Sequence, residues 1–325
     1  MGLQLGRLQQ RALTVTFLVS SLPALVSSFS HSPSSSLSLP SPGSCRMSDS
    51  GTQSEETRTA LVTGSTDGIG QYTAERLAQD GWQVLIHGRN PKRIEATLAR
   101  IQKRVPGARL HSFQADLASF ADVRRMAADV SSQFSKLDLL INNAGVYEER
   151  MQTTTDGNEF VFQVNVLSPF LLTSLLLDAV SKAPESRIII TASISQSSSL
   201  DWDNLQMEKG FSAHGSYSSS KLCNAMHAIE MAERLKRKGS RVTVNTLDPG
   251  TVNTKMLLAG WGACGIEVDS ADNQYQLATN PMWKGKTGVY TVGNRESSAS
   301  RFAYDASHRQ RLWELMEQLT GAKCL

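Results

Sequence analysis

Short apolar runs alternate with longer segments of helical spacing along the chain from residue 58 onward. Apolar runs such as 188–190 are typical of strands that are buried on both faces of a parallel sheet. Longer segments such as 91–104 place apolar residues three and four positions apart, as on one face of a helix. Strands are predicted at 59–63, 83–87, 110–114, 137–141, 187–191, 242–247 and 288–292. Strand followed by helix at this spacing predicts an α/β fold, a doubly wound parallel sheet in a single domain.

Residues 1–56 differ in composition from the rest of the chain. They contain no Asp or Glu before Asp49, an apolar stretch at 12–29 and a stretch rich in Ser and Pro at 30–44. The apolar stretch is too short and too interrupted by Ser for a membrane span, but it suits the centre of a targeting signal. The Ser-rich stretch behind it is similar to an organelle transit peptide, and the two together resemble the bipartite plastid presequences of algae with secondary plastids. We therefore expect 1–56 to be a disordered or removed presequence that directs the protein to a plastid. The secretory pathway, the mitochondrion and a signal anchor are the alternatives.

The composition narrows the class of protein. Of the 325 residues, 40% are hydrophobic and 19% are charged, as in soluble globular proteins. The net charge of +3 is small and dispersed, which argues against a nucleic-acid partner. The four cysteines are far apart and have no His partner at ligand spacing, so neither a metal site nor a disulfide framework is expected. Membrane association stays open, although 57–325 gives no sign of it.

A glycine-rich turn joins the first predicted strand to the first predicted helix. Glycines let the backbone approach a pyrophosphate closely, and the N-terminus of the following helix attracts its charge. The spacing is G-x-x-x-G-x-G and no Gly-Lys-Ser/Thr follows, which argues against a P-loop nucleotidase. The candidates for binding a dinucleotide here are Gly64, Ser65, Thr66, Asp67, Gly68, Ile69 and Gly70.

The residues after the second strand indicate which dinucleotide is bound. Folds that bind NAD place an acidic side chain here for the ribose hydroxyls. This chain has Gly88 followed by Arg89, whose guanidinium can pair with a 2′-phosphate. NADP is therefore favoured over NAD, with Asp67 as an opposing signal and a solvated loop charge as the alternative for Arg89.

Tyr217 and Lys221 are four residues apart on a predicted helix that ends before Gly239, so they lie one turn apart on the same face. A cation beside a phenol lowers the phenol's pKa, because it favours the phenolate. Such a pair can carry out acid/base chemistry near neutral pH. Taken alone, this spacing also fits an ordinary surface Tyr and Lys.

Several motifs follow one another in a characteristic order. They are the glycine-rich turn, Asp116-Leu117, Asn142 to Gly145, Asn165, Ser193, Tyr217-x-x-x-Lys221 and Pro249-Gly250-x-Val252-x-Thr254. In this order the chain from about 58 to 320 resembles the short-chain dehydrogenase/reductase family. The long 193–217 loop and the Ser-Lys-Leu-Cys-Asn sequence resemble its retinol dehydrogenase and WW-domain oxidoreductase branch. The resemblance implies a Rossmann-type fold and an NAD(P)-dependent enzyme acting on CH–OH groups.

The resemblance also implies a role for each matching residue. Tyr217 would exchange a proton with the substrate oxygen, and Lys221 would lower its pKa and hold the nicotinamide ribose. Ser193 would hydrogen-bond the substrate carbonyl, with Ser195 as the alternative, and Asn165 would hold a water that relays protons. The remaining cofactor contacts implied are Asp116 and Leu117 with Asn143, Ala144 and Gly145 on the adenine side, and Pro249, Gly250, Val252 and Thr254 around the nicotinamide.

The segment near 255–283 lies where the family keeps a mobile substrate lid, and its glycines and tryptophans suit a loop over an apolar substrate. The sequence therefore predicts an NADP-dependent oxidoreductase that interconverts a carbonyl and an alcohol on a small, lipophilic substrate. A non-catalytic NADP-binding regulatory protein and a protochlorophyllide reductase-like enzyme are the alternatives. A homo-oligomer formed through the long helices is an open expectation, because the family contains both oligomers and monomers.

Overall fold

A single eight-stranded sheet organises residues 57–325, the part of the chain that the computed structural model describes. The expected presequence, 1–56, lies outside the described residues. The strand order is β3-β2-β1-β4-β5-β6-β7-β8, and all neighbours are parallel except β7 and β8. The strands are β1 (Thr59–Val62), β2 (Gln83–Gly88), β3 (Leu110–Gln114), β4 (Leu139–Asn142), β5 (Arg187–Thr191), β6 (Thr243–Asp248), β7 (Tyr290–Val292) and β8 (Arg295–Ser297). The predicted α/β fold with a doubly wound parallel sheet in one domain is confirmed.

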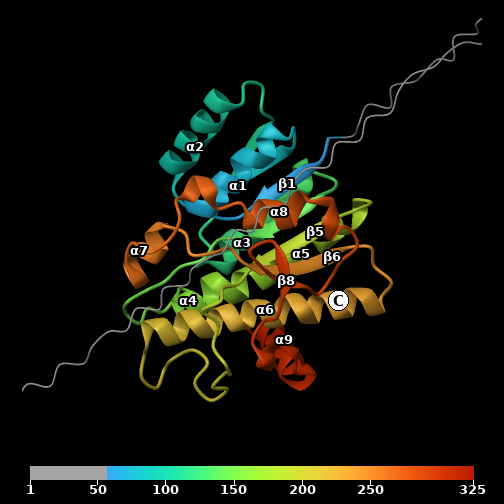
Figure 1. Cartoon of the computed structure of the whole chain (residues 1–325). Coiled ribbons are helices and arrows are strands. Elements are labelled where there is room, and N and C mark those ends of the chain that lie inside the picture. The colour runs from blue at the N-terminus through green and yellow to red at the C-terminus, as the bar shows by residue number, and fades with distance from the viewer. Residues whose placement is uncertain (1–56) are drawn as a thin grey trace, which may run out of the picture. The chain divides into compact units, whose positions relative to one another are not determined.

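Helices cover both faces of the sheet. They are α1 (Gly68–Gln79), α2 (Pro91–Arg104), α3 (Phe120–Gln133), α4 (Phe160–Phe162), α5 (Ser168–Lys182), α6 (Ala213–Arg237), α7 (Lys255–Trp261), α8 (Asn273–Thr279) and α9 (Ala306–Thr320). Figure 1 shows α1, α2 and α8 on one side of the sheet, with α6 and α9 on the other. Each side has its own apolar core, and the central strands β1 and β4 between them are buried on both faces.

The long apolar segment after β4 is buried inside the protein. Within residues 57–325, the helical stretch Phe160–Lys182 alone has the length and hydropathy of a membrane span, and 83% of its most apolar window is buried. Its apolar side chains pack against α3 and the sheet, as expected of a core helix. The predicted single helix at 159–180 is interrupted, because Gln163–Leu167 forms one π-helical turn between α4 and α5.

Three further segments differ from the pattern-based expectation. The seventh strand begins at Tyr290 rather than 288, and an eighth strand, β8, had not been predicted. All three residues of β8 are exposed, so no apolar pattern marks it, and it is held by antiparallel pairing to β7. The segment 255–283 contains two helices, α7 and α8, and two short 3-10 turns rather than an open loop.

The strand order creates the crevice in which ligands of such sheets bind. The chain passes from β3 at one edge to β4 on the opposite side of β1. The connections after β1 and β4 therefore leave the sheet in opposite directions, and a crevice opens beyond their carboxyl ends. The glycine-rich turn follows β1, and Asn143 to Gly145 follow β4, so the fold brings both motifs to this crevice.

Candidate active site

Tyr217, Lys221 and Ser193 meet at the carboxyl ends of β5 and β6. Tyr217 and Lys221 lie one turn apart on α6, with side chains 7% and 3% exposed, and the Lys221 Nζ lies 5.5 Å from the Tyr217 ring centroid. Lys221 donates a hydrogen bond to the Thr191 carbonyl oxygen at 3.0 Å. The Tyr217 hydroxyl and the Ser193 side chain form a hydrogen bond. This contact supports Ser193 over Ser195 as the substrate-binding serine.

The protonation of the pair corrects one expectation. Lys221 was expected to lower the pKa of Tyr217, but burial raises that pKa to about 12, with the negative charge of Asp248 adding to the rise and the Ser193 hydrogen bond opposing it. Burial also lowers the pKa of the Lys221 ammonium to about 8, against the opposing effect of Asp248. Removal from water disfavours both charged forms. Tyr217 is therefore a protonated phenol at neutral pH.

Asn165 lies beside the lysine in the π-helical turn and is fully buried. Its amide forms two bonds with the backbone of Val146, 2.8 Å from the Val146 nitrogen and 3.0 Å from the oxygen, and a third to Ser220 at 3.0 Å. A Cβ added at Gly145 would lie 3.4 Å from both Asn165 Oδ1 and Lys221 Nζ. The structure thus brings Asn165, Gly145 and Lys221 together, while the proposed water relay stays a prediction.

The glycine-rich turn has the close contacts that require glycine. Gly64 has φ +64°, and a Cβ there would lie 2.9 Å from Ala144 Cα. A Cβ at Gly70 would lie 2.3 Å from the Asn143 amide nitrogen. Asp67 caps α1 by accepting the Gly68 N–H at 2.9 Å, but the N–H groups of Ile69 and Gly70 have no acceptor within residues 57–325. Free N–H groups at a helix N-terminus form the donor set that a pyrophosphate requires, so the turn fits a dinucleotide.

His87 holds the same turn and was not identified from the sequence. Its Nδ1 accepts the Gly64 N–H at 3.0 Å, and its Nε2 lies 3.3 Å from the Ala115 oxygen. The ring must therefore be neutral, with its proton on Nε2. Burial lowers the pKa of His87 to about 4, which agrees with this tautomer. A single His at the end of a strand gave no pattern by which this role could have been found.

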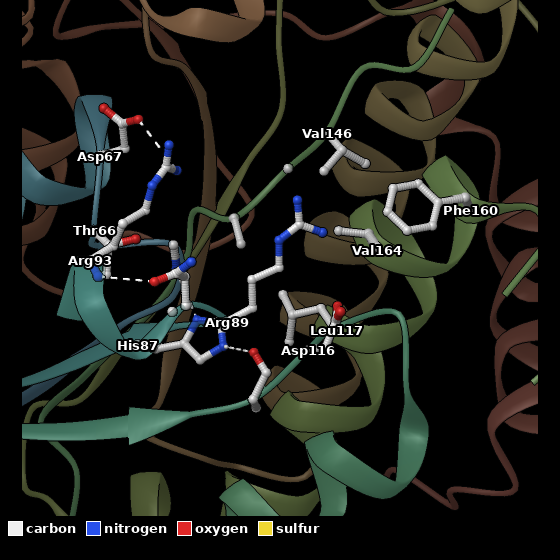
Figure 2. Close-up of a pocket in the computed structure, with 16 residues that line it drawn as sticks. Thr66, Asp67, His87, Arg89, Arg93, Asp116, Leu117, Val146, Phe160 and Val164 are labelled. Carbon is white, nitrogen blue, oxygen red and sulfur yellow. Dashed lines mark hydrogen bonds and ion pairs between the residues drawn. The ribbon is translucent and has the colours of Figure 1, made fainter. Parts of the chain in front are cut away.

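A cavity of about 430 Å³ opens beside the turn and carries two arginines. Arg89 reaches across this cavity toward Val146, while Arg93 from α2 points to Asp67 (Figure 2). The Arg93 guanidinium lies 3.8 Å from the Asp67 carboxylate, and Lys255 of α7 also forms an ion pair with Asp67. No ion pair or hydrogen bond holds the Arg89 guanidinium within 57–325. The sequence identified Arg89 but missed Arg93, one helical turn further along.

The other predicted cofactor residues are divided between cavity walls and supporting positions. Asp116 and Leu117 line the 430 Å³ cavity, as do Ala144 and Gly145. Ser65 is a supporting residue that lines neither this cavity nor the next one. Its buried hydroxyl accepts the His87 N–H at 2.9 Å. The residues that line a second, connected cavity of about 420 Å³ include Gly68, Ile69, Asn143, Tyr217, Lys221, Pro249 and Thr254.

A third cavity, of about 250 Å³, also borders Tyr217. Ser193 and Tyr217 present hydroxyls to it, and most of its remaining wall is apolar. The apolar wall consists of Ile69, Ile194, Pro249, Gly250, Val252, Met256, Leu257 and Trp261. Thr254 supports this wall by capping α7 through the Leu257 N–H at 3.3 Å. Within 57–325, no group of three or more His, Cys, Asp or Glu side chains is arranged to hold a metal ion.

Known proteins are similar to this chain over most of its length. The family model for short chain dehydrogenase matches residues 58–260. The chain is 32% identical to human (Homo sapiens) polyprenol dehydrogenase, covering 81% of this chain and 85% of that one. It is 31% identical to human retinol dehydrogenase 14, covering 81% and 86%. It is 30% identical to the chloroplastic short-chain dehydrogenase TIC 32 B of Brassica napus, covering 81% and 89%. The chain therefore belongs to the short-chain dehydrogenase family, in its retinol dehydrogenase-like branch, and is an oxidoreductase acting on CH–OH groups.

Proposed function

We propose that the protein is an NADP-dependent oxidoreductase that interconverts a carbonyl and an alcohol on a small, lipophilic substrate, with Tyr217 as the acid/base. One arrangement carries this proposal. Tyr217 lines both an apolar cavity and the cavity of the glycine-rich turn. A carbonyl in the apolar cavity would therefore lie next to the phenol and face the cofactor site.

The side chains suggest how the proton moves. In the reducing direction the Tyr217 hydroxyl donates its proton to the substrate oxygen, and in the oxidising direction the phenolate accepts it. Ser193 Oγ accepts the Ser195 N–H at 3.1 Å, and its own hydroxyl hydrogen would turn from the Tyr217 oxygen to the substrate oxygen. Two donors aimed at one oxygen stabilise the negative charge that develops there. With a pKa of about 8, Lys221 is mostly protonated at pH 7 and stabilises the phenolate as it forms.

The bound nicotinamide cofactor supplies the hydride, and the protein supplies placement and electrostatics. The turn from Gly64 to Gly70 would hold the pyrophosphate, and Asp116 would lie at the adenine. Lys221 would lie at the nicotinamide ribose, with Asn165 and its relay water near Gly145.

NADP is favoured over NAD by the charges at the adenosine end. Arg89 and Arg93 both line the 430 Å³ cavity. A Cβ at Gly88 would lie 2.6 Å from Thr66 Cγ2, so an aspartate that binds ribose hydroxyls does not fit without moving Thr66. Asp67, which opposed this assignment in the sequence, is neutralised by Arg93 and Lys255. Arg89 is exposed and its guanidinium has no partner within residues 57–325, so together with Arg93 it forms a suitable site for a dianionic 2′-phosphate.

A lipophilic substrate is favoured by the wall and rim of the 250 Å³ cavity. Two apolar side chains that line it are unusually exposed: Ile194 by 60% and Trp261 by 37%. An apolar tail lying over them would remove this surface from water. The names of the polyprenol and retinol dehydrogenases to which the chain is similar agree with an isoprenoid-like alcohol or aldehyde.

Residues 1–56 suit a plastid presequence, and similarity to a chloroplastic protein of Brassica napus supports this destination. Fluorescent-protein fusions of 1–56 and of the chain without 1–56 in plastid-bearing cells test it. Plastid fluorescence from the first fusion alone is expected. Secretory or mitochondrial fluorescence from it would contradict the plastid assignment.

Product analysis tests the proposed reaction. The full-length protein is incubated with NADPH or NADH and a panel of isoprenoid, fatty and short polar aldehydes and ketones. We expect NADPH-dependent formation of the alcohols of apolar substrates, at lower rates with NADH. Tight NADPH binding without turnover of any compound would instead favour the non-catalytic regulatory alternative. Conversion of protochlorophyllide in an illuminated assay would favour the reductase-like alternative.

A further inference from the structure

Asp248 is a buried carboxylate at the edge of the proposed active site. It ends β6, is 4% exposed and lines the 250 Å³ cavity next to Ser193 and Tyr217. Its Oδ1 accepts the Ile194 N–H at 2.9 Å, and its Oδ2 accepts the Gly250 N–H at 3.0 Å. One carboxylate oxygen is therefore bound to the residue next to Ser193, and the other is bound to Gly250, which is itself a predicted cofactor residue.

These two hydrogen bonds extend the pairing of β5 and β6 beyond the ends of the strands. Regular pairing ends with Thr191 opposite Leu247 and the Ala192 N–H bonded to the Leu247 oxygen at 2.9 Å. Past this point the Asp248 side chain connects the residue after Ser193 to the residue after Pro249. The bonds thus fix the serine against the loop that forms the other wall of the cavity. An asparagine has one acceptor oxygen and cannot replace both contacts.

The charge of Asp248 acts on the acid/base pair as well. The ionisable groups that face it are Lys221 and Tyr217 from α6 and Tyr290 from β7. Burial raises the pKa of Asp248, while the Ile194 and Gly250 N–H groups and Lys221 lower it. In turn its negative charge raises the pKa values of Lys221 and Tyr217, because it favours the ammonium and disfavours the phenolate.

We propose that Asp248 is a positioning residue of this enzyme: it fixes the Ser193 and Pro249–Gly250 loops against each other, and it keeps Lys221 charged and the proton on Tyr217. The role in turnover rests on the proposed function. Reduction requires the phenol and oxidation requires the phenolate. Removal of the negative charge therefore moves the alkaline decline of reduction, and the alkaline rise of oxidation, to lower pH.

The experiment compares Asp248→Asn with a matched control in the full-length protein. Asp138→Asn changes another buried carboxyl that accepts a backbone N–H, from Thr59 at 2.8 Å, at the amino ends of the strands. Two quantities are measured against pH: kcat/KM for reduction and oxidation, and the rate at which acetic anhydride labels Lys221 in the cofactor-free protein. Thermal unfolding of each variant is followed in parallel.

For Asp248→Asn we expect the pH midpoint of kcat/KM and the pH midpoint of Lys221 labelling each to fall by about half a pH unit or more. We also expect kcat to fall at least about tenfold at neutral pH. Asp138→Asn should leave both midpoints unchanged, whatever its effect on stability. Unchanged midpoints in Asp248→Asn would overturn the proposal. If this variant does not fold, Asp248→Ser removes the same charge and is judged by the same midpoints. A parent protein without turnover would defeat the proposed function, while the labelling of Lys221 would still decide the role of Asp248.

Discussion

The Trp261 ring packs against the Tyr217 ring, with centroids 5.3 Å apart and planes inclined by 65°. Trp261 is the last residue of α7, and it also contacts the rings of Tyr147 and His214 at 5.2 and 5.0 Å. None of the α7 residues is buried. A helix with no side chain in the core is attached mainly by such contacts. We therefore predict that α7 is a mobile lid over the cavity that it borders.

Trp261→Ala should therefore weaken the binding of apolar substrates more than the binding of polar ones. Loss of the indole removes apolar contact that a long substrate tail would use, so we expect KM for such aldehydes to rise about tenfold or more. KM for short polar aldehydes should change less than about threefold. Steady-state kinetics on both classes check this, with Trp261→Phe as a control that retains an aromatic ring. Equal changes for the two classes would remove Trp261 from substrate binding.

Arg89→Ala should weaken NADPH binding and leave NADH binding nearly unchanged. Loss of a charge-assisted contact with the 2′-phosphate costs about 2 kcal/mol, or roughly thirtyfold in Kd. Arg93→Ala should act in the same direction. Fluorescence titration with each cofactor measures Kd. Lys92→Ala is the control, because it also removes one positive charge but at a residue that does not line the 430 Å³ cavity. Parallel losses for NADPH and NADH would contradict the phosphate role.

Buried histidines should make the protein sensitive to acid. Burial lowers the pKa values of His87 to about 4 and His227 to about 3, from 6.5 in the unfolded chain. The unfolded state thus binds protons that the folded state does not, so stability is lost as pH falls below about 6.5, by about 3 kcal/mol per His at pH 4.

His227 offers the cleaner test of this effect. It packs against Phe170 and Trp313, and neither ring nitrogen has a partner among the described residues. His227→Phe should reduce the difference in unfolding free energy between pH 7 and pH 4.5 by about 2 kcal/mol. Urea unfolding at both pH values measures it, with exposed His111→Phe as the control. An unchanged difference would show that His227 does not contribute.

Breaking the ion pairs between α6 and α9 should destabilise the fold. Arg309 and Glu230 are each 4% exposed, 3.1 Å apart, and Arg309 also binds Glu233 at 2.7 Å. Arg309→Met leaves a buried Glu230 with fewer partners and should cost about 3 kcal/mol. Thermal and urea unfolding measure this loss, and Arg301→Met serves as an exposed control on the preceding turn. A loss below about 1 kcal/mol would mean that the buried network is compensated elsewhere.

The sequence predicted correctly those helices and strands that are determined by the residues within them and directly beside them in the chain. Helix α2 and strands β3 and β5 have the bounds that the apolar pattern predicted, because strong periodicity and punctuating Gly, Pro and Asn residues mark them. Strand β8 could not be found in this way, since its three residues are exposed and only pairing to β7 makes it a strand. The π-helical turn at Asn165 likewise has no mark in the apolar pattern, because all five of its residues are buried and the helix continues on both sides of it.

In the candidate site, too, local patterns were predicted from the sequence and features that depend on distant residues were not. Spacing alone placed Tyr217 and Lys221 on one helical face, and the order of motifs identified Ser193. Burial could not be judged from spacing, so the pKa of Tyr217 was expected to fall although burial raises it. His87 and Asp248 were missed because their partners, Gly64 and Ile194, are 23 and 54 residues away in the chain.

The most direct test of the central claim is the rate of carbonyl reduction by Tyr217→Phe. This variant removes the proposed proton donor and retains the ring that packs against Trp261. We predict that kcat falls by about a thousandfold, the scale of general acid catalysis, while Kd for NADPH changes less than about threefold. Tyr147→Phe, which removes a hydroxyl 3.0 Å from His214, is the matched control and should retain most of the parent rate. A Tyr217→Phe enzyme that oxidises NADPH with substrate as fast as the parent would contradict the proposed mechanism.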